Sequence, residues 1–197
     1  MIVTPCAHGL EDIIGQNEPG YIRTPGLHMS TIYNDYYQYQ DPKRYDKTKP
    51  MDVLRLEAGL SWERLLEEAI KDRIGAMGCG RPGELIGPEG IIYSPDLIIF
   101  NGSIRLGEIK LTWMSSREVP REKDYGFPPK FEKYLTQMKC YCYCLETPYA
   151  RLIAFFVNGD YRPPTPELLA WDITFSPREL KEEWATMMNW ARHRKML

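Results

Sequence analysis

Several features that would assign the chain to a membrane or to an export route are missing. The 197 residues contain no run of about 18 apolar residues, the length that a helix needs to cross a bilayer. The N-terminus has no basic segment leading into an apolar one, so no secretory signal is visible. We therefore expect a cytoplasmic protein without a membrane partner.

Patterns typical of disulfides or of histidine-rich metal sites are scarce as well. Five cysteines is an odd number, and three of them, Cys140, Cys142 and Cys144, stand two apart on a predicted helix, where their side chains diverge. A disulfide framework is therefore not expected. The three histidines fit no metal-ligand spacing.

The chain also has little net charge, with 25 basic and 27 acidic residues and a balance of −2. This balance neither supports nor excludes nucleic acid as a partner. A protein that collects carboxylates around metal ions can be neutral overall and still have a basic groove.

What is present is enough hydrophobic material for a substantial core. Hydrophobic residues make up 43% of the chain, including five Trp, six Phe and thirteen Tyr. No internal repeat or low-complexity tract is visible. We expect one domain over residues 1–197, with an N-terminal arm and short helix at 1–50, a core at 52–157 and a C-terminal helix at 176–197.

Helices are predicted in four places. A short one follows Ser30, which has the residue type of an N-cap, and ends at Pro42. Residues 52–74 carry apolar residues at spacings of three and four, which predicts a long helix, and residues 130–145 are also predicted to be helical. Ser176-Pro177-Arg178-Glu179 is a capping box with proline at the first helical position, which predicts the start of the last helix.

Strands are predicted at 84–86, 90–93, 96–100, 104–112 and 151–157. Asn101-Gly102 predicts a tight hairpin turn between the third and fourth of these. The order of helix, antiparallel strands, helix, strand and helix indicates an α/β fold with a mixed β-sheet flanked by helices.

Two carboxylates and a lysine lie on this hairpin. Glu108 and Lys110 are two apart on a strand and share a face, and Asp96 opens the preceding strand after Ser94-Pro95. Counted from a two-residue turn, Asp96 does not stand directly opposite Glu108, so the strands must splay or be offset. Phosphodiester hydrolysis needs oxygen ligands for Mg²⁺ and a cation beside the developing charge. The alternative is that Asp96 belongs to a simple turn and the other two to an exposed polar stripe.

Two helices contribute further polar candidates. Glu63 falls at the edge of the apolar stripe of helix 52–74, where it can face a half-buried cleft, and Gly59 lets something approach the backbone. Alternatively, Glu63 is a surface acid paired with a basic residue. Gln137 and Tyr141 project from one face of helix 130–145, where an amide and a phenol can hold phosphate oxygens or a base. A tyrosine at this spacing is also typical of core packing.

Together these motifs resemble the RecB-like branch of the PD-(D/E)xK nuclease superfamily, which includes lambda-type phage exonucleases. The resemblance covers residues 59–141, where four motifs stand in the family's order. They are Gly59 to Glu63 for the helical Gly-x-x-x-(His/Glu) motif, Ser94-Pro95-Asp96 for Pro-Asp, Glu108-Ile109-Lys110 for Glu-x-Lys, and Gln137 to Tyr141 for Gln-x-x-x-Tyr. The resemblance implies a restriction-endonuclease-like core.

The resemblance also implies roles for these residues. Glu63, Asp96 and Glu108 would bind Mg²⁺, for which Mn²⁺ can substitute, with help from the carbonyl of Ile109. Lys110 would position or deprotonate the attacking water, and the expected product carries a 5′-phosphate. Gln137 and Tyr141 would contact DNA.

Arg23 and the placement of the cysteines bear on this resemblance less directly. Arg23, in a turn before the first helix, resembles the arginine that lambda-type exonucleases place at the terminal 5′-phosphate of DNA. Cas4-like relatives carry four cysteines for an iron-sulfur cluster, with a grouped set after the last helix. Here three of the five cysteines fall inside helix 130–145 instead, so no such cluster is expected.

The sequence therefore predicts a Mg²⁺-dependent DNA exonuclease that resects ends in recombination or repair. Two alternatives stay open. One is an endonuclease of the same fold, either restriction-type or structure-specific, and the other is a protein of this fold that binds nucleic acid without cutting it. The resemblance also leaves open a homo-oligomer and a single-strand annealing or recombination protein as partner.

Overall fold

The computed structural model of the chain describes residues 23–45, 57–66, 68–69, 78–100, 102–120, 126–157 and 166–197. The predicted arm before residue 23 and both ends of the predicted helix at 52–74 lie outside these residues. No helix in the described ranges is long and apolar enough to cross a membrane.

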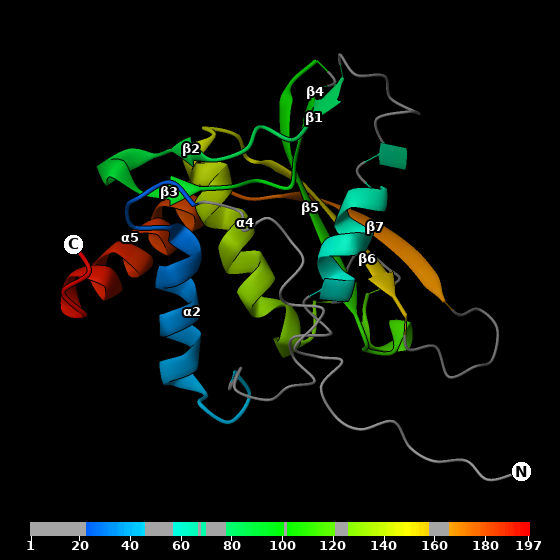
Figure 1. Cartoon of the computed structure of the whole chain (residues 1–197), viewed down its shortest axis with the longest axis horizontal. Helices are drawn as coiled ribbons and strands as arrows, with labels where there is room; N and C mark the ends of the chain where they lie inside the picture. Colours follow the sequence, from blue (N-terminus) through cyan, green and yellow to red (C-terminus); the bar gives the residue numbers. More distant parts are fainter. Residues whose placement is uncertain are drawn as a thin grey trace, which may run out of the picture.

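A mixed five-stranded sheet forms the centre of the fold (Figure 1). In spatial order its strands are β1 Cys79–Gly80, β4 Leu97–Phe100, β5 Ile104–Thr112, β6 Tyr149–Phe156 and β7 Glu167–Thr174. β5 and β6 are parallel, whereas the other neighbouring pairs are antiparallel. A parallel pair needs a crossover, and here it contains the helix α4 Glu132–Cys144. The predicted α/β fold with a mixed sheet flanked by helices is confirmed.

Helices cover both faces of this sheet. α2 Met29–Gln40, α4 and α5 Pro177–His193 pack together on one side. On the other side lies a helix that includes residues 57–66, whose Trp62 ring is 4.3 Å from the Phe155 ring, centre to centre. A short ribbon of β2 Leu85–Ile86 and β3 Ile92–Tyr93 lies beside α2. Three 3₁₀ turns complete the described elements, at Pro88–Gly90, Ser116–Glu118 and Pro129–Phe131.

Two hydrophobic clusters use the two faces of β5. Leu106 belongs to the large cluster under α2, α4 and α5. Ile109 belongs to a smaller one, against which Leu66 packs. Because alternate residues of a strand point to opposite faces, Glu108 and Lys110 share the face of Leu106 and point toward α4.

The helix starts agree with the sequence in one case and differ in another. At α5 the Ser176 side chain accepts from the Glu179 backbone N–H, and the Glu179 carboxylate accepts from the Ser176 backbone, so the capping box is confirmed. α2 begins at Met29 with His28 in the N-cap position, and no side chain caps it. The predicted N-cap at Ser30 is therefore wrong. The apolar residues at spacings of three and four in helix 52–74 include Leu65, but this side chain is exposed, so the buried stripe is narrower than the spacing predicts.

The β4–β5 hairpin differs from the predicted two-residue turn. Phe100 pairs with Ile104, so three residues connect the strands. Gly102 has a φ of 74°, a left-handed conformation that glycine adopts easily. The extra residue shifts the register by one. Leu97 stands opposite Gly107, and continuing this register brings Asp96 opposite Glu108 without any splaying.

Gly107 lets the two strands approach beside these acids. A Cβ atom at this position would lie 2.8 Å from the Cβ of Leu97, which is closer than real contacts of this kind. A glycine is therefore required where β5 passes Leu97, one residue before Glu108.

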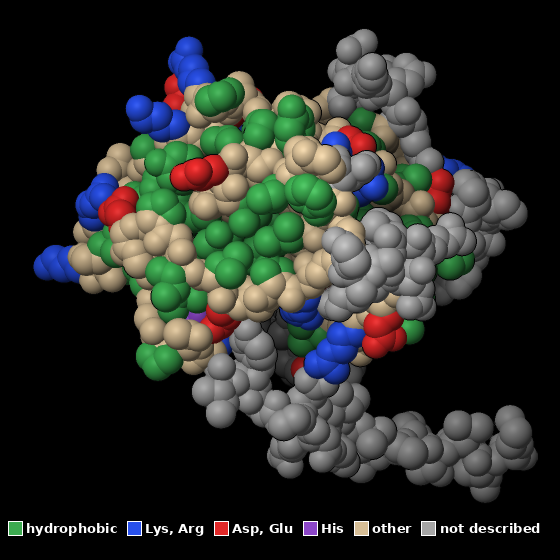
Figure 2. All heavy atoms as spheres, turned by 90° about the horizontal axis from the view of Figure 1, so that it is seen from above, with side chains coloured by type: hydrophobic (Ala, Val, Ile, Leu, Met, Phe, Trp, Pro, Cys, Tyr) green, Lys and Arg blue, Asp and Glu red, His purple; other side chains and the backbone are tan. Residues whose placement is uncertain are grey.

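The surface seen from above Figure 1 is largely hydrophobic over its middle, with Lys and Arg mainly at the margins (Figure 2). Large hydrophobic side chains that are exposed in the described ranges include Ile86, Phe100 and Ile104. A phosphate-rich ligand would meet few cations over the middle of this surface.

Candidate functional site

Asp96, Glu108 and Lys110 meet at the β4–β5 hairpin. The Ile109 backbone N–H donates to Asp96 Oδ2 at 2.8 Å, which fixes that carboxylate against β5. Lys110 Nζ lies 3.5 Å from the same Asp96 oxygen and forms an ion pair with Glu108 Oε1. The lysine thus bridges the two acids that the sequence singled out.

Glu108 is fully buried, and its surroundings disfavour its charge. Burial first, and the nearby Asp96 carboxylate second, raise the pKa of Glu108 to about 8. Its Oε1 touches the Lys110 ammonium as an ion pair, but neither carboxylate oxygen has a partner in hydrogen-bond geometry among the described residues. A buried carboxylate in this condition favours the arrival of either a proton or a cation.

Lys110 remains an ammonium at neutral pH. Burial alone would lower the pKa of Lys110, but Asp96, Glu108 and Glu63 together raise it well above the usual value. A lysine held in this form can donate hydrogen bonds and neutralise negative charge, but it is a poor proton acceptor. Of the two roles implied for Lys110, positioning the water fits this electrostatic environment better than deprotonating it.

The donor chemistry fits a hard cation at Asp96 and Glu108. Two carboxylates and the nearby Ile109 carbonyl are the oxygen ligands that Mg²⁺ prefers. Within the described ranges, however, no three His, Cys, Asp or Glu side chains are grouped closely enough to hold a metal ion. Glu63 lies near enough to influence the pKa of both Glu108 and Lys110, and its Oε2 is 3.8 Å from Arg81 Nη2. The structure therefore assembles two of the three expected acids.

A pocket of about 560 Å³ opens over this group of charged residues. It receives side chains from α2, from helix 57–66, from the β3–β4 segment, from β5 and from α4. Every predicted site residue lines it except Glu108, which lies buried beneath Lys110. A Cβ at Gly59 would meet nothing within 4 Å, so this part of the wall is open. The lining also includes His28, Ser30, Tyr33, Asn34, Ser94, Lys133 and Tyr134.

Gln137 and Tyr141 both reach the pocket from α4, although each is almost completely buried. Tyr33 of α2, a residue that the sequence analysis missed, lies close enough to Tyr141 to affect its pKa. Burial raises the pKa of both tyrosines, with the carboxylates of Glu108 and Asp96 adding to the effect. Both phenols therefore stay protonated and can donate hydrogen bonds to an anionic ligand.

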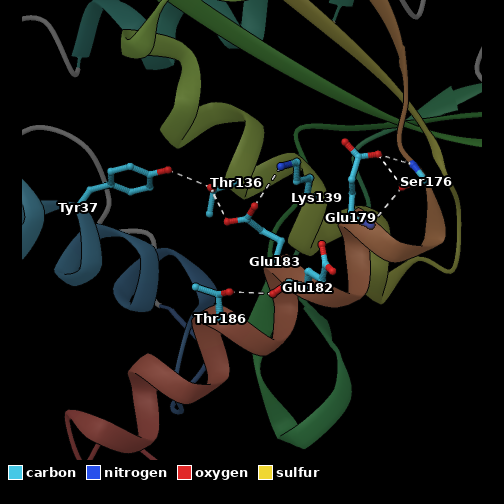
Figure 3. A network of polar contacts seen from close by, with 8 residues as sticks. All are labelled: Tyr37, Thr136, Lys139, Ser176, Glu179, Glu182, Glu183 and Thr186. Carbon is cyan, nitrogen blue, oxygen red and sulfur yellow. Dashed lines mark hydrogen bonds and ion pairs between the residues drawn. The ribbon is translucent and has the colours of Figure 1, made fainter.

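A polar network holds α4 in place behind this wall (Figure 3). Tyr37 of α2 and Thr136 of α4 share a hydrogen bond of 3.0 Å, and Thr136 donates to Glu183 of α5 at 2.8 Å. Lys139 of α4 donates to the second oxygen of Glu183 at 3.1 Å. Three helices are thus tied together next to Gln137.

Arg23 lines the far side of the pocket. Its Nη2 lies 3.5 Å from Ser30 Oγ, so both groups stand at the N-terminal end of α2. The loop between them is anchored by His28, whose ring contacts the Thr24 carbonyl at 2.9 Å and Glu84 at 3.7 Å. The structure therefore places Arg23 on the same pocket as Lys110.

Comparison with known proteins gives similarities in structure. No family model matches the chain, and no curated protein matches it in sequence. The alkaline exonuclease LHK-Exo from Laribacter hongkongensis superposes with a TM-score of 0.55 at 16% identity, over 86% of this chain and 89% of its own. The structure of LHK-Exo in complex with dAMP gives a TM-score of 0.56 at the same identity and coverage.

A third solved structure, of a protein named SSO0001, has a TM-score of 0.55 at 16% identity and covers 95% of this chain and 83% of that one. At such identities the likeness concerns the fold. This chain shares its fold with an alkaline exonuclease.

Proposed function

We propose that the chain is a metal-dependent DNA nuclease of the RecB-like PD-(D/E)xK type. We further propose that it acts as an exonuclease that resects DNA ends in recombination or repair and leaves 5′-phosphates. The observation that carries the proposal is the bridge of Asp96, Lys110 and Glu108 at one pocket, in a fold shared with an alkaline exonuclease. Arginine, glutamine and tyrosine side chains that suit phosphate surround the same pocket.

In the proposed mechanism, the carboxylates of Asp96 and Glu108 and the Ile109 carbonyl would hold the cation. Mg²⁺ or Mn²⁺ would supply positive charge beside the scissile phosphate and ease the deprotonation of water. Glu63 lines the same pocket and would be the third carboxylate ligand.

The remaining residues act on the substrate. Lys110 releases Glu108, keeps its proton, and donates hydrogen bonds to the attacking water or to a phosphate oxygen. Gln137, with Tyr141 beside it, orients the phosphate from α4. Arg23 would hold a terminal phosphate by charge-assisted hydrogen bonds, which would favour chain ends over internal positions.

A cleavage assay tests this proposal and separates its alternatives. Linear duplex DNA and covalently closed circular DNA are incubated with the purified protein in Mg²⁺ or in EDTA. We expect linear DNA alone to be degraded, and only with the metal. Cutting of closed circles would support the endonuclease of the same fold. Intact DNA in every reaction would support the alternative that the protein binds nucleic acid without cutting it.

Variants connect the activity to the site. Lys110→Ala is expected to lose at least about 100-fold in rate, as removal of a group that acts in proton transfer or charge stabilisation commonly does. Lys181→Ala is the matched control, because this exposed lysine of α5 lies away from the pocket. Equal rates for the two variants would contradict the proposed mechanism.

A further inference from the structure

Basic side chains and tyrosine rings form a row that leads out of the pocket. Lys110 Nζ lies 5.6 Å from the ring centre of Tyr134. The neighbouring Lys133 lies 5.6 Å from the ring of Tyr33 and 5.4 Å from that of Tyr45. The Arg44 guanidinium also lies 5.6 Å from the centre of the Tyr45 ring. We call the members beyond Lys110 the aromatic track: Tyr33, Arg44, Tyr45, Lys133 and Tyr134.

Position distinguishes the track from the other tyrosines of α2. Tyr36 packs edge-on against Trp190 of α5, and Tyr37 belongs to the network around Thr136, so both have a clear structural task. Lys133 and Tyr134, in contrast, line the pocket directly. At the outer end of the track, Arg44 is exposed and Tyr45 is half-buried.

The alternation of rings and cations matches the chemistry of single-stranded nucleic acid. Unpaired bases stack on aromatic side chains, while basic side chains neutralise the phosphates between them. In a duplex the faces of the bases are already stacked on each other, so flat rings such as those of Tyr45 and Tyr134 would have no base to contact. The track therefore favours unpaired nucleotides over paired ones.

Charge by itself does not account for this surface. Burial raises the pKa of the Tyr45 hydroxyl, and the nearby carboxylates of Glu132 and Asp41 add to this effect. These carboxylates offset part of the positive charge of Arg44 and Lys133. A ligand that used only its phosphates would gain little here. A ligand that also offered base faces would use the rings, which again indicates a single strand.

We propose that the aromatic track binds an unpaired segment of the DNA strand that enters the reaction centre. Its bases stack on Tyr45 and Tyr134, and its phosphates contact Lys133 and Arg44. The Tyr33 ring holds Lys133 in place by a cation–π contact. This inference rests on the proposed function, because it makes the segment part of the nuclease substrate.

Binding without cleavage tests the track independently of hydrolysis. The full chain is titrated, in EDTA, into a fluorescein-labelled oligothymidylate of about 12 nucleotides, a length within the usual footprint of single-strand sites. Fluorescence anisotropy then gives Kd at several salt concentrations. The proteins compared are wild type, Tyr45→Leu, Lys133→Gln and the control Lys181→Gln on α5. A blunt duplex of the same length serves as the second probe.

We expect Tyr45→Leu to weaken oligothymidylate binding by at least about five-fold, the loss of one stacked base, with a smaller effect on the duplex. Lys133→Gln is expected to reduce the slope of log K against log salt by about 0.7, the loss of one phosphate contact on a single strand. Lys181→Gln should match wild type. Circular dichroism checks the fold of each variant, and Tyr134→Leu replaces Tyr45→Leu if the latter does not fold.

The outcomes separate the track from the proposed function. If wild type degrades DNA in Mg²⁺ but the folded variants bind oligothymidylate as tightly as wild type, the proposed role of the aromatic track is wrong. The proposed nuclease activity is then still supported. If the variants lose binding while no protein cleaves DNA, the aromatic track binds single strands as proposed, but the proposed nuclease activity is wrong. Equal losses for single strand and duplex would also overturn the track, because they would indicate a general phosphate contact.

Discussion

Removing the charge of Glu108 is expected to stabilise the metal-free protein at alkaline pH. Glu108 is fully buried, and its pKa is raised from 4.5 to about 8, chiefly by burial. A raised pKa means that the folded protein holds the proton more tightly than the unfolded chain does. The contribution of Glu108 to the free energy of unfolding therefore falls as the pH rises from about 4.5 to about 8, and it stays low above that. Glu108→Gln keeps the shape of the side chain and removes this loss.

The size of the effect follows from the same numbers. The difference between 8 and 4.5 corresponds to a ceiling of about 5 kcal/mol, at about 1.4 kcal/mol for each pKa unit. That pKa already includes the attraction of Lys110, and the polarity of a real protein interior weakens the burial penalty further, so we expect about 2 kcal/mol at pH 9. For a chain of 197 residues this is a rise in Tm of about 4–8 °C.

The assay is thermal unfolding in EDTA at pH 5, 7 and 9. Glu182→Gln is the control, since Glu182 is an exposed acid of α5. The gain in Tm for Glu108→Gln should be near zero at pH 5 and largest at pH 9. Added Mg²⁺ should then raise the Tm of wild type but not that of Glu108→Gln. A gain that does not depend on pH, or a loss at pH 9, would show that the charge of Glu108 does not destabilise the folded protein.

Three further predictions concern the frame around the site. Gly107→Ala should destabilise the protein by about 1–3 kcal/mol, because its Cβ would overlap that of Leu97, and urea unfolding measures this; an unchanged midpoint would contradict the close approach of β4 and β5. Thr136→Val should lower the free energy of unfolding by about 1–2 kcal/mol in the same assay, because Glu183 loses one hydrogen-bond donor. A neutral effect would show that the network of Figure 3 does not stabilise the fold. Arg23→Gln should raise the KM for 5′-phosphorylated ends more than that for 5′-hydroxyl ends, and equal changes would remove Arg23 from phosphate binding.

Much of the frame of the site was predictable from local patterns. β5 has the predicted bounds of 104–112, and the capping box at Ser176 was legible because it depends on residues only three apart. The alternation of side chains on β5 placed Glu108 and Lys110 on one face. The register of Asp96 was not predictable, because a third loop residue in the β4–β5 hairpin moves every pair by one position.

Other elements escaped because their signals depend on contacts that are distant in sequence. β7 was not predicted, since exposed Leu168 and Ala170 alternate with half-buried Leu169 and Trp171 and hide the period of two. The spacing of four that links Gln137 to Tyr141 also reaches back to Lys133, and this signal could have placed Lys133 at the site. Tyr33 had no such signal, because only the packing of α2 on α4 brings it there.

A crystal soaked in Mn²⁺ at alkaline pH shows through anomalous density whether Asp96 and Glu108 bind a cation. We expect a peak about 2.1 Å from carboxylate oxygens of both Asp96 and Glu108, with the Lys110 ammonium turned from Glu108 toward the pocket. A pocket without a peak, with Lys110 still paired to Glu108, would rule out the proposed metal site.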